Sequence, residues 1–257
     1  TPEGPSASLK ASHHIGDRLV YQQIRSITGG HLKYAISGGA PLGERLGHFF
    51  RAVGITVFEG YGLTETSAPT CVNVPGAIKV GSVGRAYPSC RVTTDEEGEI
   101  LAKGDHVFVG YNNNEEATKA TFTEDGWLRT GDLGVVDEDG FVWVTGRKKE
   151  IIVTAGGKNV APAVLEDRLR GHPLISQIVV VGDKRPFISA LVTLDAEMLP
   201  GWLKNHGFEA LTVAEAVKDP QVLASIDRAI KRANEAVSRA ESIRKFTVLP
   251  IDFTTDN

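Results

Sequence analysis

Residues 32–58 constrain the fold more than any other part of the sequence, because they predict a strand, a helix and a second strand in direct succession. A short run typical of a β-strand, residues 32–36, leads into the glycine-rich segment 37–41. Apolar residues then recur at helical spacing until Gly54, which suits the end of a helix, and residues 55–58 form the next apolar run. This order predicts two parallel strands in one sheet, and ligands bind beyond the carboxyl ends of such strands.

A second glycine-rich segment, residues 60–66, follows directly and is predicted to turn tightly, so that the backbone comes close to a ligand. Tyr61 offers a flat ring, Thr64 a hydroxyl, and Glu65 a carboxylate that is a hard ligand for Mg2+. These groups suit a planar base, a phosphate and a metal ion; an ordinary strand-to-turn connection is the alternative interpretation. Both glycine-rich segments leave strands of one parallel sheet, so we expect them to open on the same edge.

The remaining sequence predicts two further regions. Between residues 80 and 144, short β-rich runs alternate with Gly, Asp and Asn turns, which indicates an antiparallel sheet or a small barrel. Beyond this region, helical and strand patterns indicate a compact α+β domain. We therefore expect an α/β and α+β chain with domains 1–148 and 149–257, in which residues 1–17 form a loop.

Three features of the later sequence are candidate binding groups. Asp132 is predicted to lie in a tight turn, where its carboxylate can accept two hydroxyl hydrogen bonds from a ribose or can bond its own backbone. Arg147 suits a nucleotide's oxygens in a fixed fork, and a surface salt bridge is the alternative. The loop 154–159 is either a linker or, through Gly156 and Gly157, a surface for an elongated ligand.

Composition excludes some classes of protein. The chain has 257 residues and a formal net charge of -4, which gives no reason to expect nucleic-acid binding. Cys71 and Cys90 fit no metal-ligand spacing and are predicted to be free thiols in a reducing compartment. No apolar window is long enough to cross a membrane, so we expect a cytoplasmic protein and leave peripheral membrane contact open.

Five segments, in this order, resemble the AMP-forming superfamily of acyl-CoA synthetases, luciferases and adenylation domains. They are residues 37–42, 61–66, 81–84, 126–132 and 146–152. Each segment is weak evidence alone, but their order over more than a hundred residues is specific. The sequence is most similar to the long-chain fatty acid CoA ligases, because of Glu59 before the second segment and residues 243–246 before Leu249 and Pro250.

The resemblance implies a two-step reaction. A fatty carboxylate attacks the α-phosphate of ATP to give an acyl-adenylate, and the thiol of coenzyme A then attacks the adenylate carbonyl. Family motifs imply the following roles, each at a matching residue: Gly38, Gly39 and Ala40 line the adenine, Tyr61 stacks on it, Thr64 bonds phosphate oxygens, Glu65 holds Mg2+, and Asp132 and Arg147 grip the ribose. Lys149 is the implied hinge about which the small domain turns, and Gly156 and Gly157 then line the pantetheine channel.

The sequence also departs from the family pattern. A phosphate-binding loop rich in Thr, Ser and Gly is expected upstream, and a lysine is expected after the Leu-Pro phrase; neither has a counterpart in these 257 residues. We therefore expect a C-terminal fragment, inactive alone, with the fatty-acyl tunnel in the missing part. A fatty acyl-AMP ligase, a carrier-protein-loading adenylation domain and a non-catalytic nucleotide-binding module are the alternatives. Acyl chain length and oligomeric state stay open.

Overall fold

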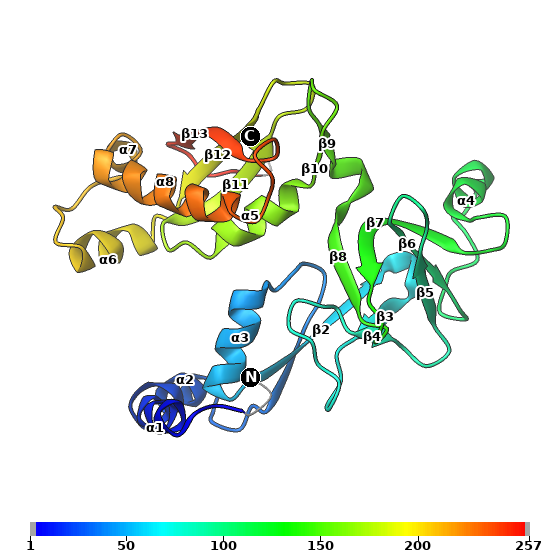
Figure 1. Ribbon diagram of the computed structural model, residues 1–257, viewed down its shortest axis with the longest axis horizontal. Helices are drawn as coiled ribbons and strands as arrows, with labels where there is room; N and C mark the ends of the chain where they lie inside the picture. Colours follow the sequence, from blue (N-terminus) through cyan, green and yellow to red (C-terminus); the bar gives the residue numbers. More distant parts are fainter. Residues whose placement is uncertain (1–3, 255–257) are drawn as a thin grey trace. The chain divides into compact units, whose positions relative to one another are not determined.

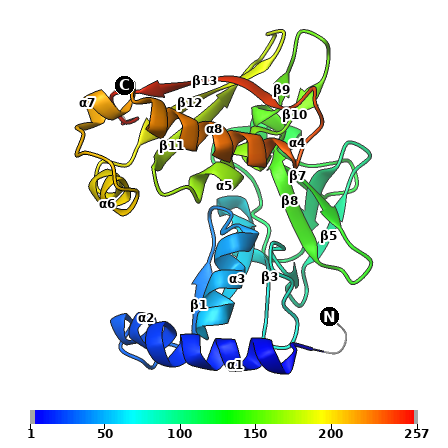
Figure 2. The same cartoon turned by 60° about the vertical axis from the view of Figure 1, so that its left-hand side comes forward.

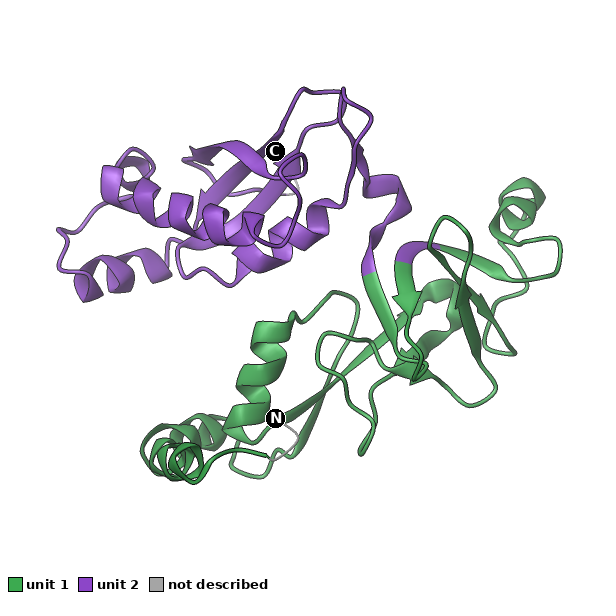
Figure 3. Cartoon of the chain, viewed as in Figure 1, with its two compact units in different colours: residues 1–130, 134–144 green, residues 131–133, 145–257 purple. Residues whose placement is uncertain are grey.

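The computed structural model describes residues 4–254, which form two compact units (Figure 3). The first unit runs to Thr130 and includes Gly134–Val144; the second comprises Gly131–Leu133 and the chain from Thr145 onward. Each unit has its own helices and its own buried core. The domain boundaries predicted from the sequence, 1–148 and 149–257, stay predictions.

Three helical elements open the first unit: α1 (Ala7–Gly16), the π-helical η1 (Asp17–Tyr21) and α2 (Gln22–Ile27). The Ser6 hydroxyl caps α1 by accepting a hydrogen bond from the Leu9 amide at 3.2 Å. The loop predicted for residues 1–17 was therefore wrong over α1, while residues 1–3 lie outside the described part of the chain.

Contacts with the end of a later helix explain why this polar segment is helical. Arg25 pairs with Asp17 at 2.7 Å and also donates a hydrogen bond to the Val53 carbonyl. A ring nitrogen of His13 lies 2.9 Å from the Ala52 carbonyl oxygen. The Val53 and Ala52 carbonyls lie 28 and 39 residues from Arg25 and His13 in the sequence, so no local pattern predicted these two contacts.

The predicted strand-helix-strand unit is confirmed. It consists of β1 (Tyr34–Ser37), α3 (Glu44–Val53) and β2 (Thr56–Leu63), and Figures 1 and 2 show α3 beside the two strands. The strands are parallel, with Ser37 opposite Glu59. Gly54 ends α3 in the left-handed conformation at φ 90°, which glycine adopts without steric cost.

The second glycine-rich segment continues the strand instead of turning, so the tight turn predicted at its start was wrong. β2 pairs antiparallel with β3 (Ala68–Val72), and the turn between them is a 3-10 helix, η2 (Thr64–Thr66). A Cβ at Gly62 would lie 1.8 Å from the Ala68 carbonyl oxygen. Glycine therefore serves close strand packing at this position. A short fourth strand, β4 (Arg85–Ala86), completes the order β1-β2-β3-β4.

A second four-stranded sheet confirms the predicted β-rich region. Its strands, in spatial order, are β5 (Arg91–Thr94), β6 (Glu99–Lys103), β7 (Leu128–Val136) and β8 (Val142–Arg147), and α4 (Glu115–Thr121) lies between β6 and β7 in the sequence. β5 and β6 are antiparallel, and the sheet curls into a half-barrel. Asp132 lies inside β7, so the tight turn predicted around it was wrong.

The second unit is the predicted α+β fold. It contains the 3-10 helix η3 (Lys148–Glu150), a hairpin of β9 (Ile152–Val153) and β10 (Asn159–Val160), and a sheet with the order β11 (Ile175–Val181), β12 (Ile188–Leu194), β13 (Ile243–Leu249). Its helices are α5 (Pro162–Arg170), α6 (Met198–Asn205), α7 (Val213–Ala216) and α8 (Pro220–Asn234). α5 contacts β11 and α8, and α8 contacts β13. Leu165, Leu169, Ile188 and Ile226 are fully buried in this core.

A carboxylate fastens the end of the described chain to this sheet. Asp252 accepts hydrogen bonds from the hydroxyls of Ser176 at 2.6 Å and Thr193 at 2.5 Å, and from the amide of Gln177 at 3.0 Å. The three donors lie on β11 and β12. These bonds hold the pKa of Asp252 below its ordinary value. The carboxylate thus joins segments about 60 to 76 residues apart.

Cys71 and Cys90 are free thiols, as the sequence predicts. Burial raises the pKa of the Cys71 thiol to about 12, so it is a packed core side chain and not a nucleophile. Among residues 4–254, no helix combines the length and the apolar character that crossing a membrane requires.

Candidate functional site

The two glycine-rich segments of the first unit lie next to each other. The parallel register places Ser37, the last residue of β1, opposite Glu59 within β2, and a Cβ on Gly38 would lie 3.4 Å from the Gly60 carbonyl oxygen. Gly38, Gly39 and Ala40 are exposed. The site thus has an open backbone edge, formed by a turn and by the adjacent strand.

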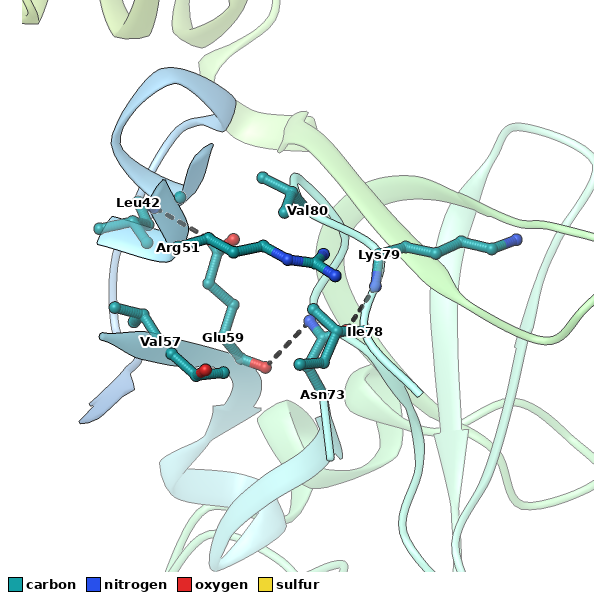
Figure 4. A pocket seen from close by; sticks show the side chains of 10 residues that line it. Leu42, Arg51, Val57, Glu59, Asn73, Ile78, Lys79 and Val80 are labelled. Carbon is teal, nitrogen blue, oxygen red and sulfur yellow. Dashed lines mark hydrogen bonds between the residues drawn. The ribbon is translucent and has the colours of Figure 1, made fainter. Parts of the chain in front are cut away.

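Glu59 ties that turn to the rest of the unit. Its carboxylate accepts a hydrogen bond from the Leu42 amide at 3.0 Å and a second from the Gly81 amide. Its backbone carbonyl accepts hydrogen bonds from Asn73 (Figure 4). The Asn73 side chain also donates to the Ser82 carbonyl at 2.6 Å. Glu59 is only 7% exposed, and burial raises the pKa of its carboxyl.

Tyr61 occupies β2, opposite Cys71 on β3. Its ring is half-buried and packs against the small core formed by Cys71, Ile100 and Val142. One part of the ring is therefore supported by protein. Tyr61 directly follows Gly60 within β2.

η2 presents Thr64 and Glu65 at the end of β2. The hydroxyl of buried Thr66 fixes this short helix, because it accepts a hydrogen bond from the Leu63 amide at 2.8 Å. Thr64 is exposed. Glu65 is half-buried; its carbonyl accepts from the Phe108 amide at 2.8 Å.

The Glu65 carboxylate also has a partner. The Tyr111 hydroxyl donates a hydrogen bond to its Oε1 atom at 2.7 Å. This bond to Glu65 raises the pKa of the Tyr111 phenol. The carboxylate is therefore oriented before any ligand binds.

A magnesium ion fits this donor set only together with a phosphate ligand. Within residues 4–254, no three His, Cys, Asp or Glu side chains gather to hold a metal by themselves. Mg2+ is commonly bound through one or two carboxylates plus phosphate and water oxygens. Glu65, beside the hydroxyl of Thr64, is a donor of the right kind for such an ion.

Asp132 and Arg147 form an ion pair in the second unit. Arg147 Nε lies 2.9 Å from Asp132 Oδ1. Asp132 is 3% exposed, whereas the Arg147 side chain is 58% exposed. The pair thus combines a fixed acceptor with an accessible cation, which suits a ligand that carries hydroxyl and phosphate groups.

Lys149, Gly156 and Gly157 also belong to the second unit. Lys149 is exposed in η3, two residues after β8 ends. The two glycines are exposed at the tip of the β9-β10 hairpin, which is closed by a hydrogen bond of 3.0 Å from the Thr154 amide to the Lys158 carbonyl. The Ala155 amide donates to the Arg185 carbonyl at 2.9 Å, so the hairpin is attached to the β11-β12 turn.

Sequence reasoning did not assign roles to two residues of the first unit. Glu59 was noted only as part of a motif, although its acidic side chain within an apolar strand was a usable signal of a buried, bonded carboxylate. Tyr111 had no such signal, because its partner Glu65 is 46 residues away.

Two family models match the chain. Residues 9–112 match the model described as AMP-binding enzyme, and residues 149–257 match the AMP-binding enzyme C-terminal domain. Among curated proteins, the chain is 56% identical over 254 residues to the long-chain-fatty-acid--CoA ligase FadD15 of Mycobacterium tuberculosis. That alignment covers 98% of this chain and 42% of FadD15. It is also 39% identical to the long-chain-fatty-acid--CoA ligase ACSBG2 of Gallus gallus, over 96% of this chain and 36% of the relative. The chain thus spans less than half the length of these relatives.

Solved structures agree in fold. O-succinylbenzoate coenzyme A synthetase (MenE) from Bacillus subtilis, in complex with ATP and magnesium ion, matches with a TM-score of 0.65 and 27% identity, over 89% of this chain and 46% of MenE. ATP-bound MatB from Rhodopseudomonas palustris matches with a TM-score of 0.63 and 31% identity, over 88% of this chain and 43% of MatB. The mixed α/β architecture is therefore that of adenylate-forming enzymes.

Replacing Glu59 tests whether it holds the turn. We expect Glu59→Ala to lower the free energy of unfolding by about 1–3 kcal/mol, because two amide donors lose their acceptor. Glu59→Gln keeps an oxygen acceptor and should lose less. Urea denaturation of this chain, monitored by tryptophan fluorescence, measures both values, and an Ala variant as stable as the wild type would contradict the assignment.

The raised pKa of Glu59 gives that variant a pH signature. A carboxyl whose folded-state pKa exceeds the ordinary 4.5 stabilises the fold most below that value, and this contribution is lost as pH rises through the folded-state pKa. Glu59→Gln does not titrate. The stability of the wild type relative to this variant should therefore fall as pH rises above the ordinary carboxyl pKa of 4.5, and a constant difference would show that the carboxyl is not desolvated.

Proposed function

This chain belongs to the AMP-binding enzyme family, and we propose that it is part of a long-chain fatty acid CoA ligase. The observation that carries the proposal is the 56% identity to FadD15 across 98% of the chain. The whole protein would convert a fatty carboxylate, ATP and coenzyme A to an acyl-CoA thioester. The first step gives an acyl-adenylate, and the second transfers the acyl group to the thiol.

The first unit supplies groups for the adenine and the phosphates. Gly38, Gly39 and Ala40 offer an exposed backbone edge to the adenine, and Tyr61 offers its ring for stacking. The Thr64 hydroxyl suits a phosphate oxygen, since it is exposed at the end of β2. These groups bind and orient the nucleotide, so that the carboxylate substrate meets the α-phosphate in line.

Glu65 is the proposed magnesium ligand. A bound Mg2+ neutralises charge that develops on the leaving pyrophosphate. MenE and MatB, which share this fold, have been solved with ATP, and MenE also with magnesium ion. The contribution of Glu65 is to hold one anionic oxygen in a fixed place, where the hydrogen bond from Tyr111 orients it.

The ion pair of the second unit is the proposed ribose site. Buried Asp132 accepts hydrogen bonds from the ribose hydroxyls, and exposed Arg147 donates to oxygens of the nucleotide. The 2.9 Å contact between the two side chains keeps both in place while no nucleotide is bound.

We propose the domain assignment in the same terms. Residues 1–148 are the C-terminal half of the large AMP-binding domain, and 149–257 are the small mobile domain. Lys149 is the hinge between two poses, one for adenylate formation and one for thioester formation. In the second pose, Gly156 and Gly157 line the channel for the pantetheine arm of coenzyme A.

The activity is tested directly on the whole protein. Incubation with ATP, Mg2+, coenzyme A and a series of saturated fatty acids should yield acyl-CoA and AMP, measured by mass spectrometry. Failure with every acid of the series would refute the ligase. Adenylate formation without thioester formation would point to a different acyl acceptor.

Glu65→Gln in the whole protein should lower the rate of adenylate formation on the order of 100-fold or more, because a charged oxygen next to the metal is lost while the side-chain shape is kept. Rapid-quench detection of the adenylate measures this rate at limiting Mg2+. Glu138→Gln is the matched control, since Glu138 is exposed in the β7-β8 turn. An equal rate in the wild type and Glu65→Gln would remove Glu65 from the site.

Lys149→Pro should separate the two half-reactions. Proline fixes φ and removes a donor, so a hinge residue that must change φ and ψ between two poses would be trapped in one of them. We expect near-normal adenylate formation with thioester formation reduced on the order of 10-fold or more. Lys149→Ala is the control, because it removes the side chain and keeps the backbone free.

Each half-reaction of the Lys149 variants is measured by rapid quench, beside a thermal melt. Equal loss in both steps with an unchanged melt would argue against a hinge at this residue.

A further inference from the structure

We propose that Tyr111 is a positioning residue that presents the Glu65 carboxylate to the magnesium–nucleotide complex. The inference rests on the proposed function, since that function makes Glu65 the metal ligand. The observation that supports the inference is the hydrogen bond of 2.7 Å from the Tyr111 hydroxyl to Glu65 Oε1. The bond joins two segments that are 46 residues apart in the sequence.

Glu65 is held at its backbone as well as at its carboxylate. The Phe108 amide donates to the Glu65 carbonyl oxygen at 2.8 Å, three residues before Tyr111. The segment that carries Phe108 and Tyr111 thus holds both the backbone carbonyl and the side-chain carboxylate of Glu65. A glutamate on the chain surface would otherwise sample several rotamers and would lose that freedom on binding a metal.

Tyr111 is itself held in place by its backbone amide and by its ring. Its amide donates to the Thr118 hydroxyl at 2.9 Å, and Thr118 in turn donates to the Asn114 carbonyl at 2.8 Å. Its ring packs edge-on against Phe108, with ring centroids 4.9 Å apart. Phe108 stacks against Phe122 at 5.9 Å. Because the ring is held, the position of its hydroxyl is set by packing and not by the carboxylate alone.

The geometry assigns different tasks to the two carboxylate oxygens. Oε1 accepts the phenol hydrogen bond, and Oε2 would be the oxygen that holds a metal ion. Hydrogen bonding to Glu65 raises the pKa of the Tyr111 phenol, so the hydroxyl keeps its proton at neutral pH.

A structural role for the same bond makes a different prediction. If the bond only fastened the segment of Tyr111 to η2, its loss would lower the stability of the fold and would leave metal affinity per folded molecule unchanged. Tyr111→Phe distinguishes the two roles, since it keeps the ring and its packing and removes only the hydroxyl.

The experiment uses the whole protein and Mn2+ as the probe for the metal. Binding of Mn2+ to the complex with a non-hydrolysable ATP analogue is measured by electron paramagnetic resonance of the free ion. For Tyr111→Phe we expect the Mn2+ Kd to rise about 3- to 10-fold, in line with the net contribution of one typical hydrogen bond. We expect an unchanged Kd for the analogue without metal and an unchanged thermal melt.

Two controls complete the test. Tyr87→Phe removes the hydroxyl of another partly exposed tyrosine of the first unit and should leave the Mn2+ Kd unchanged. In a Glu65→Gln background, Tyr111→Phe should add no further loss of Mn2+ affinity, because the two residues act through one carboxylate. In steady-state assays the apparent KM for Mg2+ should rise, and kcat at saturating Mg2+ should be retained.

The outcomes separate this inference from the proposed function. A wild-type protein that binds no Mn2+–nucleotide complex and makes no adenylate would overturn the proposed function and this inference with it. A wild type that does both, beside a Tyr111→Phe variant with the same Mn2+ Kd, would overturn the positioning role alone. An equal additional loss in the Glu65→Gln background would likewise overturn it.

Discussion

The candidate nucleotide-binding edge of the first unit depends on the parallel pairing of β1 with β2. This pairing places Ser37, the last residue of β1, opposite Glu59, so the turn after β1 lies beside the second half of β2. The exposed turn after β1 and the phenol, hydroxyl and carboxylate groups along β2 and η2 thereby share one edge of the sheet. The pairing depends on backbone hydrogen bonds and on the helix that returns the chain, which is why residues widely separated in the sequence meet there.

Buried polar groups in each unit carry a cost that the structure offsets locally. A carboxylate removed from water is destabilising unless it gains partners, and Glu59 gains two amide donors. Asp132 gains Arg147, and the hydroxyl of Thr66 closes its own short helix. In each case the partner fixes the direction of a polar group beside a proposed ligand contact. Stability and orientation thus come from the same bonds.

Local patterns in the sequence predicted the elements whose signals are local. Gly54 marked the end of α3, and residues of the same kind stand at the ends of other helices: Pro162 and Gly171 at the two ends of α5, and Asp219 and Pro220 at the start of α8. These residues act through their own φ angle or cap, so their meaning does not depend on distant parts of the chain. The family motifs likewise named the candidate ligand groups, because each motif is a short contiguous run.

The failures have a common cause in long-range contacts. α1 was missed because the residues that support it, around Val53, are almost forty residues further along. The sequence around Gly62 predicted a turn, whereas the lack of a side chain at Gly62 makes room for the backbone of β3. The hydroxyl of Tyr111 reaches Glu65 only after two separate segments have packed. A pairing of this kind has no trace in either segment taken alone.

The hydrogen bonds that Asp252 accepts from β11 and β12 have a consequence for the order in which the second unit folds during synthesis. β12 is the central strand of its sheet, yet its parallel neighbour β13 and the carboxylate that bonds Thr193 are synthesised some fifty to sixty residues later. The second unit therefore cannot complete its sheet while the ribosome is still translating α6 through α8. During that interval the edge of β12 that pairs with β13 lacks its partner, and folding of the unit waits until β13 and Asp252 have been synthesised.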